Sequence, residues 1–140
     1  MSVNVLIVDD SVTIRLMIKK VLMISLGDEL GDVYEASDGI SALSRIADND
    51  ISVMMVDLNM PRMNGMQLIS RLKSNPKYSD IPIVVISTEG SEERIRELEE
   101  LGIAGYIRKP FRPEQIRKVL SNILEICNEC PTSSSDGCDF

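Results

Sequence analysis

The architecture of this chain follows from one run near its start, which reads Val3-Asn4-Val5-Leu6-Ile7-Val8-Asp9-Asp10. Its apolar part is short and rich in β-branched side chains, a pattern typical of a central strand in a parallel sheet that is covered on both faces. Residues 53–56 and 83–86 repeat this pattern, while residues 33–36 and 105–108 are shorter and more polar and are expected at the sheet edges. The sequence therefore predicts five strands.

Helical patterns fill the intervals between these runs. The expected helices cover residues 12–26, 40–47 and 66–73 and a last segment that starts at Pro113, a residue suited to a first helical position. Ser91 can cap one further helix. That helix offers the core only Ile95, Leu98 and Leu101, so we expect it to be weakly anchored. Five strand–helix repeats with right-handed crossovers predict an α/β fold with helices on both faces of one sheet.

Length, composition and charge limit the class of protein. A chain of 140 residues suits one domain without room for a second globular unit, and its 44% hydrophobic and 26% charged residues are typical of a globular protein. The net charge of −7 argues against a nucleic-acid-binding surface. No apolar stretch approaches the roughly 20 residues that span a bilayer, and no signal peptide precedes the first strand, so we expect a cytoplasmic protein.

The histidine and cysteine content narrows the chemistry. The chain has no histidine, which excludes a histidine base, a histidine metal ligand and phosphorylation on its own histidine. Cys127, Cys130 and Cys138 lie near the C-terminus, where one C-x-x-C pair with a third cysteine makes a poor zinc pattern. We interpret them as incidental thiols, with metal or redox use as the alternative. Residues 128–140 are rich in Ser, Pro and Gly and are expected to form a flexible tail.

Polar side chains follow the apolar runs where each strand should end. Asp9 and Asp10 follow the first run and Asp57 follows the third, while Ser87 and Lys109 close the last two. Because ligands of an open parallel sheet bind at the carboxyl ends of its strands, these groups should converge. Carboxylates, a hydroxyl and a lysine suit the joint binding of a hard cation and a phosphoryl group. Mg²⁺ would also offset the repulsion between the two adjacent acids.

The acidic residues have simpler interpretations as well. Asp9 or Asp10 could cap the helix that follows, although a cap needs only one acid. Asp57 could be an incidental acid at the start of the constrained turn that Pro61 and Gly65 mark. A carboxylate that closes so apolar a strand is, however, costly to bury unless a cation or a donor compensates it.

Ser87 and Lys109 also allow more than one interpretation. The Ser87 hydroxyl could be satisfied by nearby backbone, and Lys109 could be a surface lysine with a buried stem. Lys109 precedes Pro110, and a bond before proline can be cis far more readily than other peptide bonds. A cis bond there could fix where the ammonium group points.

Taken in order, these positions resemble the CheY-like receiver domain of bacterial two-component signalling. The resemblance rests on Asp9-Asp10, on Asp57 with the D-x-x-M-P-x-M-x-G run, on Ser87 and on Lys109-Pro110-Phe111. It covers residues 3–126. It implies a flavodoxin-like three-layer sandwich with strand order 2-1-3-4-5 and a receiver domain over residues 1–127. Because no output domain is attached, it also implies a stand-alone response regulator.

The resemblance implies roles for the acids and the lysine. Asp57 would accept a phosphoryl group from a phosphohistidine on a partner histidine kinase. Asp10, Asp57 and the backbone carbonyl of Asn59 would hold Mg²⁺ directly, and Asp9 would act mainly through water. Lys109 would contact a phosphoryl oxygen as a point charge. The chain would thus be a phosphoacceptor in signalling rather than an enzyme with a substrate of its own.

The output would depend on Ser87 and Tyr106. By resemblance, Ser87 and the Thr88 amide would bind phosphoryl oxygens, and the shift of Ser87 would leave space for Tyr106, the aromatic switch position. Without that resemblance, Tyr106 is equally a half-buried aromatic of an edge strand. Asn59 and Glu89 flank the site and match the residue types of chemotaxis-type receivers, whereas Thr88 is bulkier than the family's usual residue and could slow transfer. The effector would be a protein that binds the Tyr106 face.

Three other functions remain open to the sequence. A phosphorelay intermediate or phosphate sink would use the same site. A Mg²⁺-dependent aspartyl-phosphate phosphohydrolase of the haloacid dehalogenase type would need a D-x-D pair, and Asp9-Asp10-Ser11 lacks that spacing. A flavodoxin-like cofactor binder would need a first loop rich in Ser, Thr and Gly, where two acids would instead repel a phosphate.

Overall fold

The computed structural model describes residues 3–60, 62–88 and 91–124. Its centre is a five-stranded parallel sheet in the order β2-β1-β3-β4-β5, which confirms the expected flavodoxin-like topology. The strands are β1 (Val3–Val8), β2 (Leu30–Ala36), β3 (Val53–Val56), β4 (Ile83–Ser87) and β5 (Gly105–Arg108).

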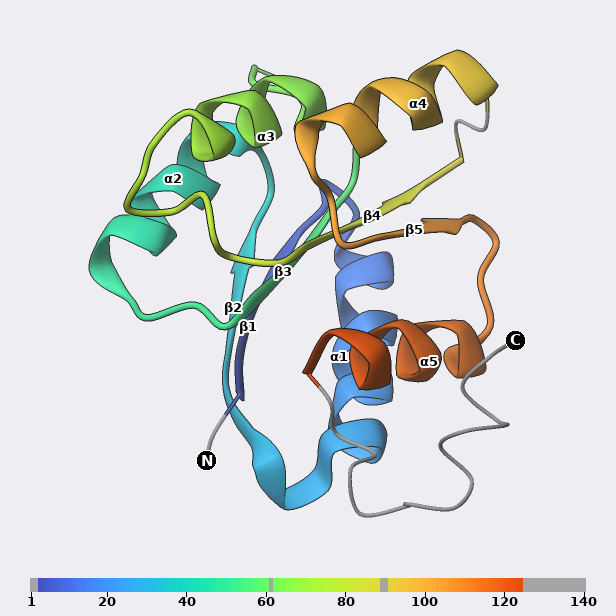
Figure 1. Ribbon diagram of the computed structural model, residues 1–140. Helices are drawn as coiled ribbons and strands as arrows, with labels where there is room; N and C mark the ends of the chain where they lie inside the picture. The colour runs from blue at the N-terminus through green and yellow to red at the C-terminus, as the bar shows by residue number, and fades with distance from the viewer. Residues whose placement is uncertain (1–2, 61, 89–90, 125–140) are drawn as a thin grey trace.

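Five α-helices alternate with these strands and cover both faces of the sheet. They are α1 (Val12–Leu26), α2 (Gly39–Asp48), α3 (Gly65–Lys73), α4 (Glu92–Leu101) and α5 (Pro113–Leu124). Figure 1 shows α2, α3 and α4 on one side of the sheet and α1 and α5 on the other. The predicted three-layer sandwich is therefore confirmed. No helix in the part of the chain that the structure describes is long and apolar enough to cross a bilayer.

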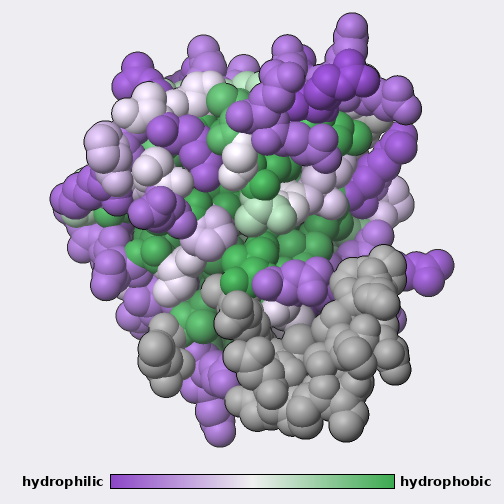
Figure 2. Space-filling view, in the orientation of Figure 1, coloured by the Kyte–Doolittle hydropathy of each residue, from purple (hydrophilic) through white to green (hydrophobic). Residues whose placement is uncertain are grey.

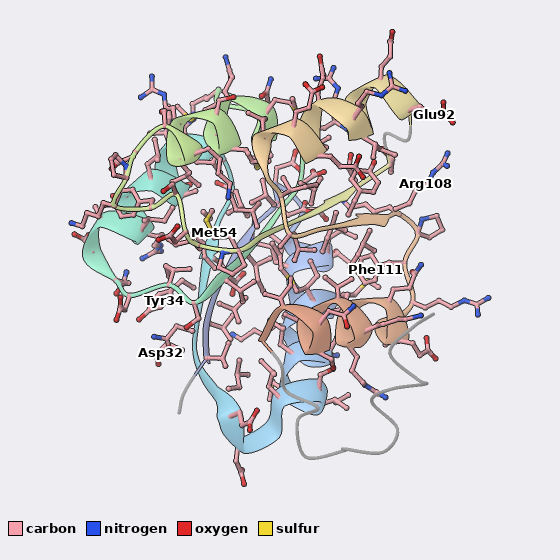
Figure 3. All side chains as sticks on the ribbon, viewed as in Figure 1. Asp32, Tyr34, Met54, Glu92, Arg108 and Phe111 are labelled. Carbon is pink, nitrogen blue, oxygen red and sulfur yellow. The ribbon has the colours of Figure 1, made fainter. Side chains whose placement is uncertain are left out.

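Each face of the sheet has its own hydrophobic core, and the strands divide their side chains between the two. In β1, Leu6 and Val8 pack on the α2–α4 side, and Val5 and Ile7 pack on the α1–α5 side. Successive side chains of a strand point to opposite faces, so a strand that is covered on both must be apolar at every position. This is why β1, β3 and β4 lack polar alternation. Met54 lies at the middle of the sheet among these packed side chains (Figure 3).

The strand and helix limits agree closely with the predicted ones, except at β2. This strand has seven residues and begins at Leu30 rather than at residue 33, so it is the longest strand and not a short one. The Asn4 side chain explains the extension, because its Oδ1 accepts a hydrogen bond of 2.9 Å from the Asp32 backbone N–H. A single 3-10 turn, Gly27–Glu29, joins α1 to β2.

The helix starts follow ordinary capping chemistry. Ser11, and neither Asp9 nor Asp10, caps α1: its Oγ accepts from the Ile14 N–H at 3.3 Å. The Asp9 carboxylate instead accepts the Ser11 backbone N–H at 2.9 Å. The predicted Ser91 cap of α4 is confirmed by its bond to the Arg94 N–H. Neither acid before α1 therefore serves as the cap of that helix.

The surface differs between the layers. Figure 2 shows hydrophilic side chains over the α3 and α4 side of this view, with apolar surface exposed across its middle, between the positions of α4 and α5. α4 is the least anchored of the five helices that the described residues form, because Leu98 is its one buried residue. That agrees with the weak anchoring expected from its sequence.

Candidate functional site

Three carboxylates meet at the carboxyl ends of β1 and β3. Oxygen atoms of Asp9, Asp10 and Asp57 all lie within 4.8 Å of one another. The strand pairing creates this cluster, since Val8 lies beside Val56 and the Asp57 N–H donates to the Val8 carbonyl at 2.8 Å. Asp9 and Asp57 are 2% and 5% exposed, whereas Asp10 is exposed. Two buried acids thus adjoin one that solvent reaches.

Lys109 joins the cluster from the end of β5. Its Nζ lies 3.0 Å from Asp9 Oδ2 and 3.6 Å from Asp57 Oδ1, and its side chain is 15% exposed. The Lys109 backbone N–H donates to the Ser87 carbonyl at 2.8 Å, and the Lys109–Pro110 bond is cis. The lysine therefore points into the site, and its interpretation as a surface side chain is wrong.

The electrostatics of the cluster are unbalanced. Burial raises the pKa of the Asp57 carboxyl above its ordinary value, and the neighbouring negative charges of Asp9 and Asp10 raise it further. The Lys109 ammonium and the Asn59 backbone N–H lower the pKa, but they offset the rise only in part. One ammonium group cannot neutralise three carboxylates. The site therefore has an excess of negative charge that a cation would relieve.

The donor atoms of this cluster fit Mg²⁺. All of them are carboxylate oxygens, the ligands that hard divalent cations prefer, and the chain has no histidine that would favour a softer metal. Asp10 is exposed, so water can complete the coordination, as Mg²⁺ usually requires. The structure thus agrees with the expected place of a metal site.

The loop after Asp57 needs a glycine at its end. The Gly65 N–H donates to the Leu58 carbonyl at 3.1 Å, which folds the loop back onto the strand. A Cβ atom on Gly65 would lie 2.4 Å from the Asp57 carbonyl oxygen and 2.8 Å from the Leu58 Cα. Asn64 then caps α3 by accepting from the Gln67 N–H at 3.0 Å. The last residues of the D-x-x-M-P-x-M-x-G run therefore fix the position of Asp57.

The remaining predicted site residues come from β4 and β5. Ser87 is fully buried at the end of β4, Thr88 is exposed just beyond it, and Asn59 is exposed beside Asp57. Tyr106 lies opposite Val85 in β5, with a partly buried ring that packs against the α2–α4 core and a hydroxyl oxygen shielded from solvent. Glu89 lies outside the described residues, as do Cys127, Cys130, Cys138 and the expected tail over 128–140.

Two arginines near the site escaped the sequence analysis. Arg15 donates from Nη1 to the Asp9 carbonyl and from Nε to Glu35 at 2.9 Å. Arg62 pairs with the buried Asp38, which also caps α2. Asp38 could have been identified, because an Asp just before a helical pattern is a common helix cap. The arginines contact residues far away in the sequence, and no local pattern predicts such contacts.

The sequence matches the family described as response regulator receiver domain over residues 5–121. It is 38% identical over 122 residues to a chemotaxis protein CheY homolog of Campylobacter jejuni, a match that covers 86% of this chain and 92% of that protein. CheY1 of Helicobacter pylori is also 38% identical, with 86% and 96% covered.

The fold comparison agrees with the sequence matches. The structure of the chemotaxis response regulator CheY4 of Vibrio cholerae superposes with a TM-score of 0.76 at 33% identity. That superposition covers 88% of this chain and 99% of the other. The chain therefore belongs to the receiver domain family of response regulators, the CheY-type proteins of two-component signalling.

Proposed function

We propose that Asp57 accepts a phosphoryl group from a phosphohistidine on a partner histidine kinase, and that the chain signals as a single-domain response regulator. One observation carries the proposal: a carboxylate that is 5% exposed lies 3.6 Å from the Lys109 ammonium and within 4.8 Å of two further acids. In the transfer, an Asp57 oxygen bonds to phosphorus as the phosphorus–nitrogen bond breaks, and the departing imidazole nitrogen takes up a proton.

Different residues around Asp57 would bind the metal ion and the phosphoryl group. Asp10, Asp57 and the Asn59 carbonyl would hold Mg²⁺, with Asp9 acting mainly through water. Bound Mg²⁺ supplies positive charge that offsets the repulsion between phosphoryl oxygens and carboxylates. Asp9 also holds the Lys109 ammonium beside Asp57, because Lys109 Nζ lies 3.0 Å from Asp9 Oδ2. The acid that is least exposed therefore positions the lysine.

Lys109, Ser87 and Thr88 would receive the phosphoryl oxygens. The Lys109 ammonium is close enough to Asp57 to meet a group attached there without a large movement. The Ser87 hydroxyl donates to a second oxygen and the Thr88 amide to a third, while Asn59 and Glu89 flank the group. These contacts replace water around the transferred charge, and such positioning supplies most of the catalysis in phosphoryl transfer.

Phosphorylation would change the surface through Tyr106 and α4. Movement of Ser87 toward the phosphoryl group alters the packing beside Tyr106, which stands next to β4 in the sheet. α4 has one buried side chain to resist a shift, so a small energy can move it. The effector would be a protein that binds this face. The chemotaxis names of the relatives support a role in chemotaxis for this chain. The proposed place of action is the cytoplasm.

Labelling with a small acyl phosphate and Mg²⁺ tests the proposal. We expect one phosphoryl group per chain, sensitive to hydroxylamine as acyl phosphates are, and located at Asp57 by peptide mapping. Asp57→Asn should remove the label, while Asp32→Asn, which changes an exposed acid on β2, should keep it. Full labelling of the Asp57→Asn protein would reject Asp57 as the acceptor. Steady turnover of an added phosphomonoester would favour the phosphohydrolase alternative.

A further inference from the structure

The outer face of α1 is unusually apolar. Among the large hydrophobic residues that the described part of the chain exposes, five of six lie on this helix: Val12, Leu16, Met17, Met23 and Ile24. Ile24 is 75% exposed and Met17 45%, although α1 already buries Ile18, Val21, Leu22 and Leu26 against the sheet. Exposed apolar residues that gather on one element usually mark a contact surface.

Part of this face forms one wall of a groove. The groove lies between α1 and the start of α5, has a volume of about 320 Å³, and is lined mainly by apolar surface. Its apolar lining comes from Met17, Val21, Ile24, Phe111 and Pro113. Phe111 lines the groove from the loop that joins β5 to α5 (Figure 3). The groove can therefore take an apolar side chain.

The rim of the groove is basic in a protein that is acidic overall. Lys20 and Arg117 stand at its edge, from α1 and α5 respectively. Among the described residues neither of them has an ion pair or a side-chain hydrogen bond, whereas the whole chain has a net charge of −7. A fitting occupant would combine an apolar anchor with nearby carboxylates.

The chain's own last residues have this composition. Residues 125–140 contain four acids, Glu125, Glu129, Asp136 and Asp139, and no lysine or arginine. Phe140 stands directly after Asp139 and is one of only two phenylalanines in the chain, the other being Phe111 in the groove. Serine, glycine and a proline make up much of the rest, so this segment cannot build a core of its own.

The segment is also long enough to reach the groove. Arg117 lies seven residues before the end of α5 at Leu124, which is about 10 Å along the helix at 1.5 Å per residue. Sixteen extended residues span roughly 50 Å at about 3.3 Å each. Residues 125–140 are therefore long enough to run back along α5 to Arg117 and to form a turn as well.

We propose that residues 125–140 fold back on their own domain and that Phe140 enters the groove between α1 and α5. Asp136 and Asp139 then stand beside Lys20 and Arg117 on the rim. The apolar contact holds the segment, and the charge pairs set its direction. The groove thus has an intramolecular occupant, and the exposed part of α1 is shielded from other molecules.

Methyl NMR spectra of the full chain give a direct test. An aromatic ring in the groove shifts the methyl signals of Met17 and Ile24, so we expect Phe140→Ala to move both signals and Phe140→Leu to move them in the same way. Met54, in the middle of the sheet, is the internal control and should stay unchanged. If Phe140→Ala leaves the Met17 and Ile24 signals where they were, the proposal is overturned.

A spin label shows where the segment lies. The label is attached to Cys138 in a chain that has Cys127→Ser and Cys130→Ser, and amide signals of residues 17–24 and 113–117 should broaden. Charge reversal with Lys20→Glu and Arg117→Glu should abolish the broadening, and Asp136→Lys with Asp139→Lys should restore it in that background. Arg96→Glu on the exposed face of α4 is the matched control and should have no effect.

A mixed sample separates a segment of the same chain from a second copy. Spin-labelled chains without isotope are mixed with isotope-labelled chains without a spin label, so broadening there can arise only between molecules. The proposal requires that the groove signals stay sharp in the mixture. Broadening that appears only in the mixture would assign the groove to a second copy, and absence of broadening in both samples would leave the segment away from the groove; either result overturns the proposal.

Discussion

Asp57 and Asp38 are both buried acids, but their surroundings shift their carboxyl pKa values in opposite directions. Burial and the negative charges of Asp9 and Asp10 raise the pKa of the Asp57 carboxyl, and the Lys109 ammonium offsets this rise only in part. Asp38 accepts the Ser41 backbone N–H at 2.8 Å and a side-chain bond from Arg62, so the pKa of its carboxyl is lowered. The surroundings of Asp57 therefore disfavour its anion, which a bound cation would relieve, whereas Asp38 is a structural anion.

The lowered pKa of Asp38 predicts how stability changes with pH. An acid whose pKa is lower in the folded state contributes stability above its ordinary value of 3.8, and this contribution is lost as pH falls through the folded pKa. Asp38→Asn keeps the helix cap but removes the charge, so we expect a loss of about 1–2 kcal/mol in the free energy of unfolding at pH 7. Urea denaturation at pH 7 and near pH 3 measures the difference.

The arginine partner supplies the control for Asp38. In an Arg62→Gln background the cost of Asp38→Asn should be smaller, because part of the stabilising charge is already gone. Near pH 3, the Arg62→Gln proteins with and without Asp38→Asn should approach equal stability. A cost of Asp38→Asn that is the same at both pH values would show that the charge contributes nothing.

At the scale of the elements, the turn between β3 and α3 leaves no room for a side chain at Gly65. Gly65→Ala puts a methyl group against the backbone of Asp57 and Leu58, the two residues that directly follow β3. We expect a loss of about 2–3 kcal/mol in the free energy of unfolding, in the range of overpacked sites, together with slower phosphorylation because the Asp57 carbonyl must move. Urea denaturation and the acyl phosphate labelling rate measure the two effects.

Gly102 provides the matched glycine. It ends α4 with a φ of 91°, and a Cβ atom there would meet only the far end of Lys73 at 3.9 Å. Gly102→Ala should cost about 1 kcal/mol through its backbone conformation and leave the labelling rate unchanged. Equal effects of the two substitutions on labelling would mean that Gly65 does not position Asp57.

The elements also show how far the sequence alone predicts this molecule. The limits of β1, β3, β5 and α1 match their predictions because buried apolar runs and helical periodicity are local signals. β2 was predicted too short, because its first residues pair through the Asn4 side chain, 28 residues away in sequence. Ser11 caps α1 in place of an acid, because the Asp9 carboxylate accepts hydrogen bonds from the Lys109 ammonium and from the Ser11 N–H.

The site was predictable for a related reason. Its acids, Ser87 and Lys109 each stand at a strand end, and the order of strands in the sheet brings strand ends together. The sequence alone did not predict how the charges around Asp57 offset one another, nor the Arg62–Asp38 pair. Both depend on side chains that meet only in the folded chain. Local patterns give positions along the chain, whereas charge compensation is a property of the packed molecule.

The whole molecule should be stabilised by Mg²⁺. A ligand that binds only the folded state raises the free energy of unfolding by about 2.7 kcal/mol at one hundred times its dissociation constant. We expect the urea midpoint of the native chain to rise with Mg²⁺, and that rise to be much reduced in Asp57→Asn and in Asp10→Asn. Asp32→Asn is the control and should retain it in full. A midpoint that is insensitive to Mg²⁺ would argue against a metal site at this cluster.

The contact between Lys109 and Asp9 joins positions 100 residues apart. During synthesis the acids of β1 leave the ribosome long before the lysine that completes their surroundings. A nascent or C-terminally truncated chain therefore exposes an unfinished pocket without its ammonium group. We therefore expect a fragment that ends before β5 to be a poorer phosphoryl acceptor than the whole chain, because it lacks the ammonium group beside Asp57.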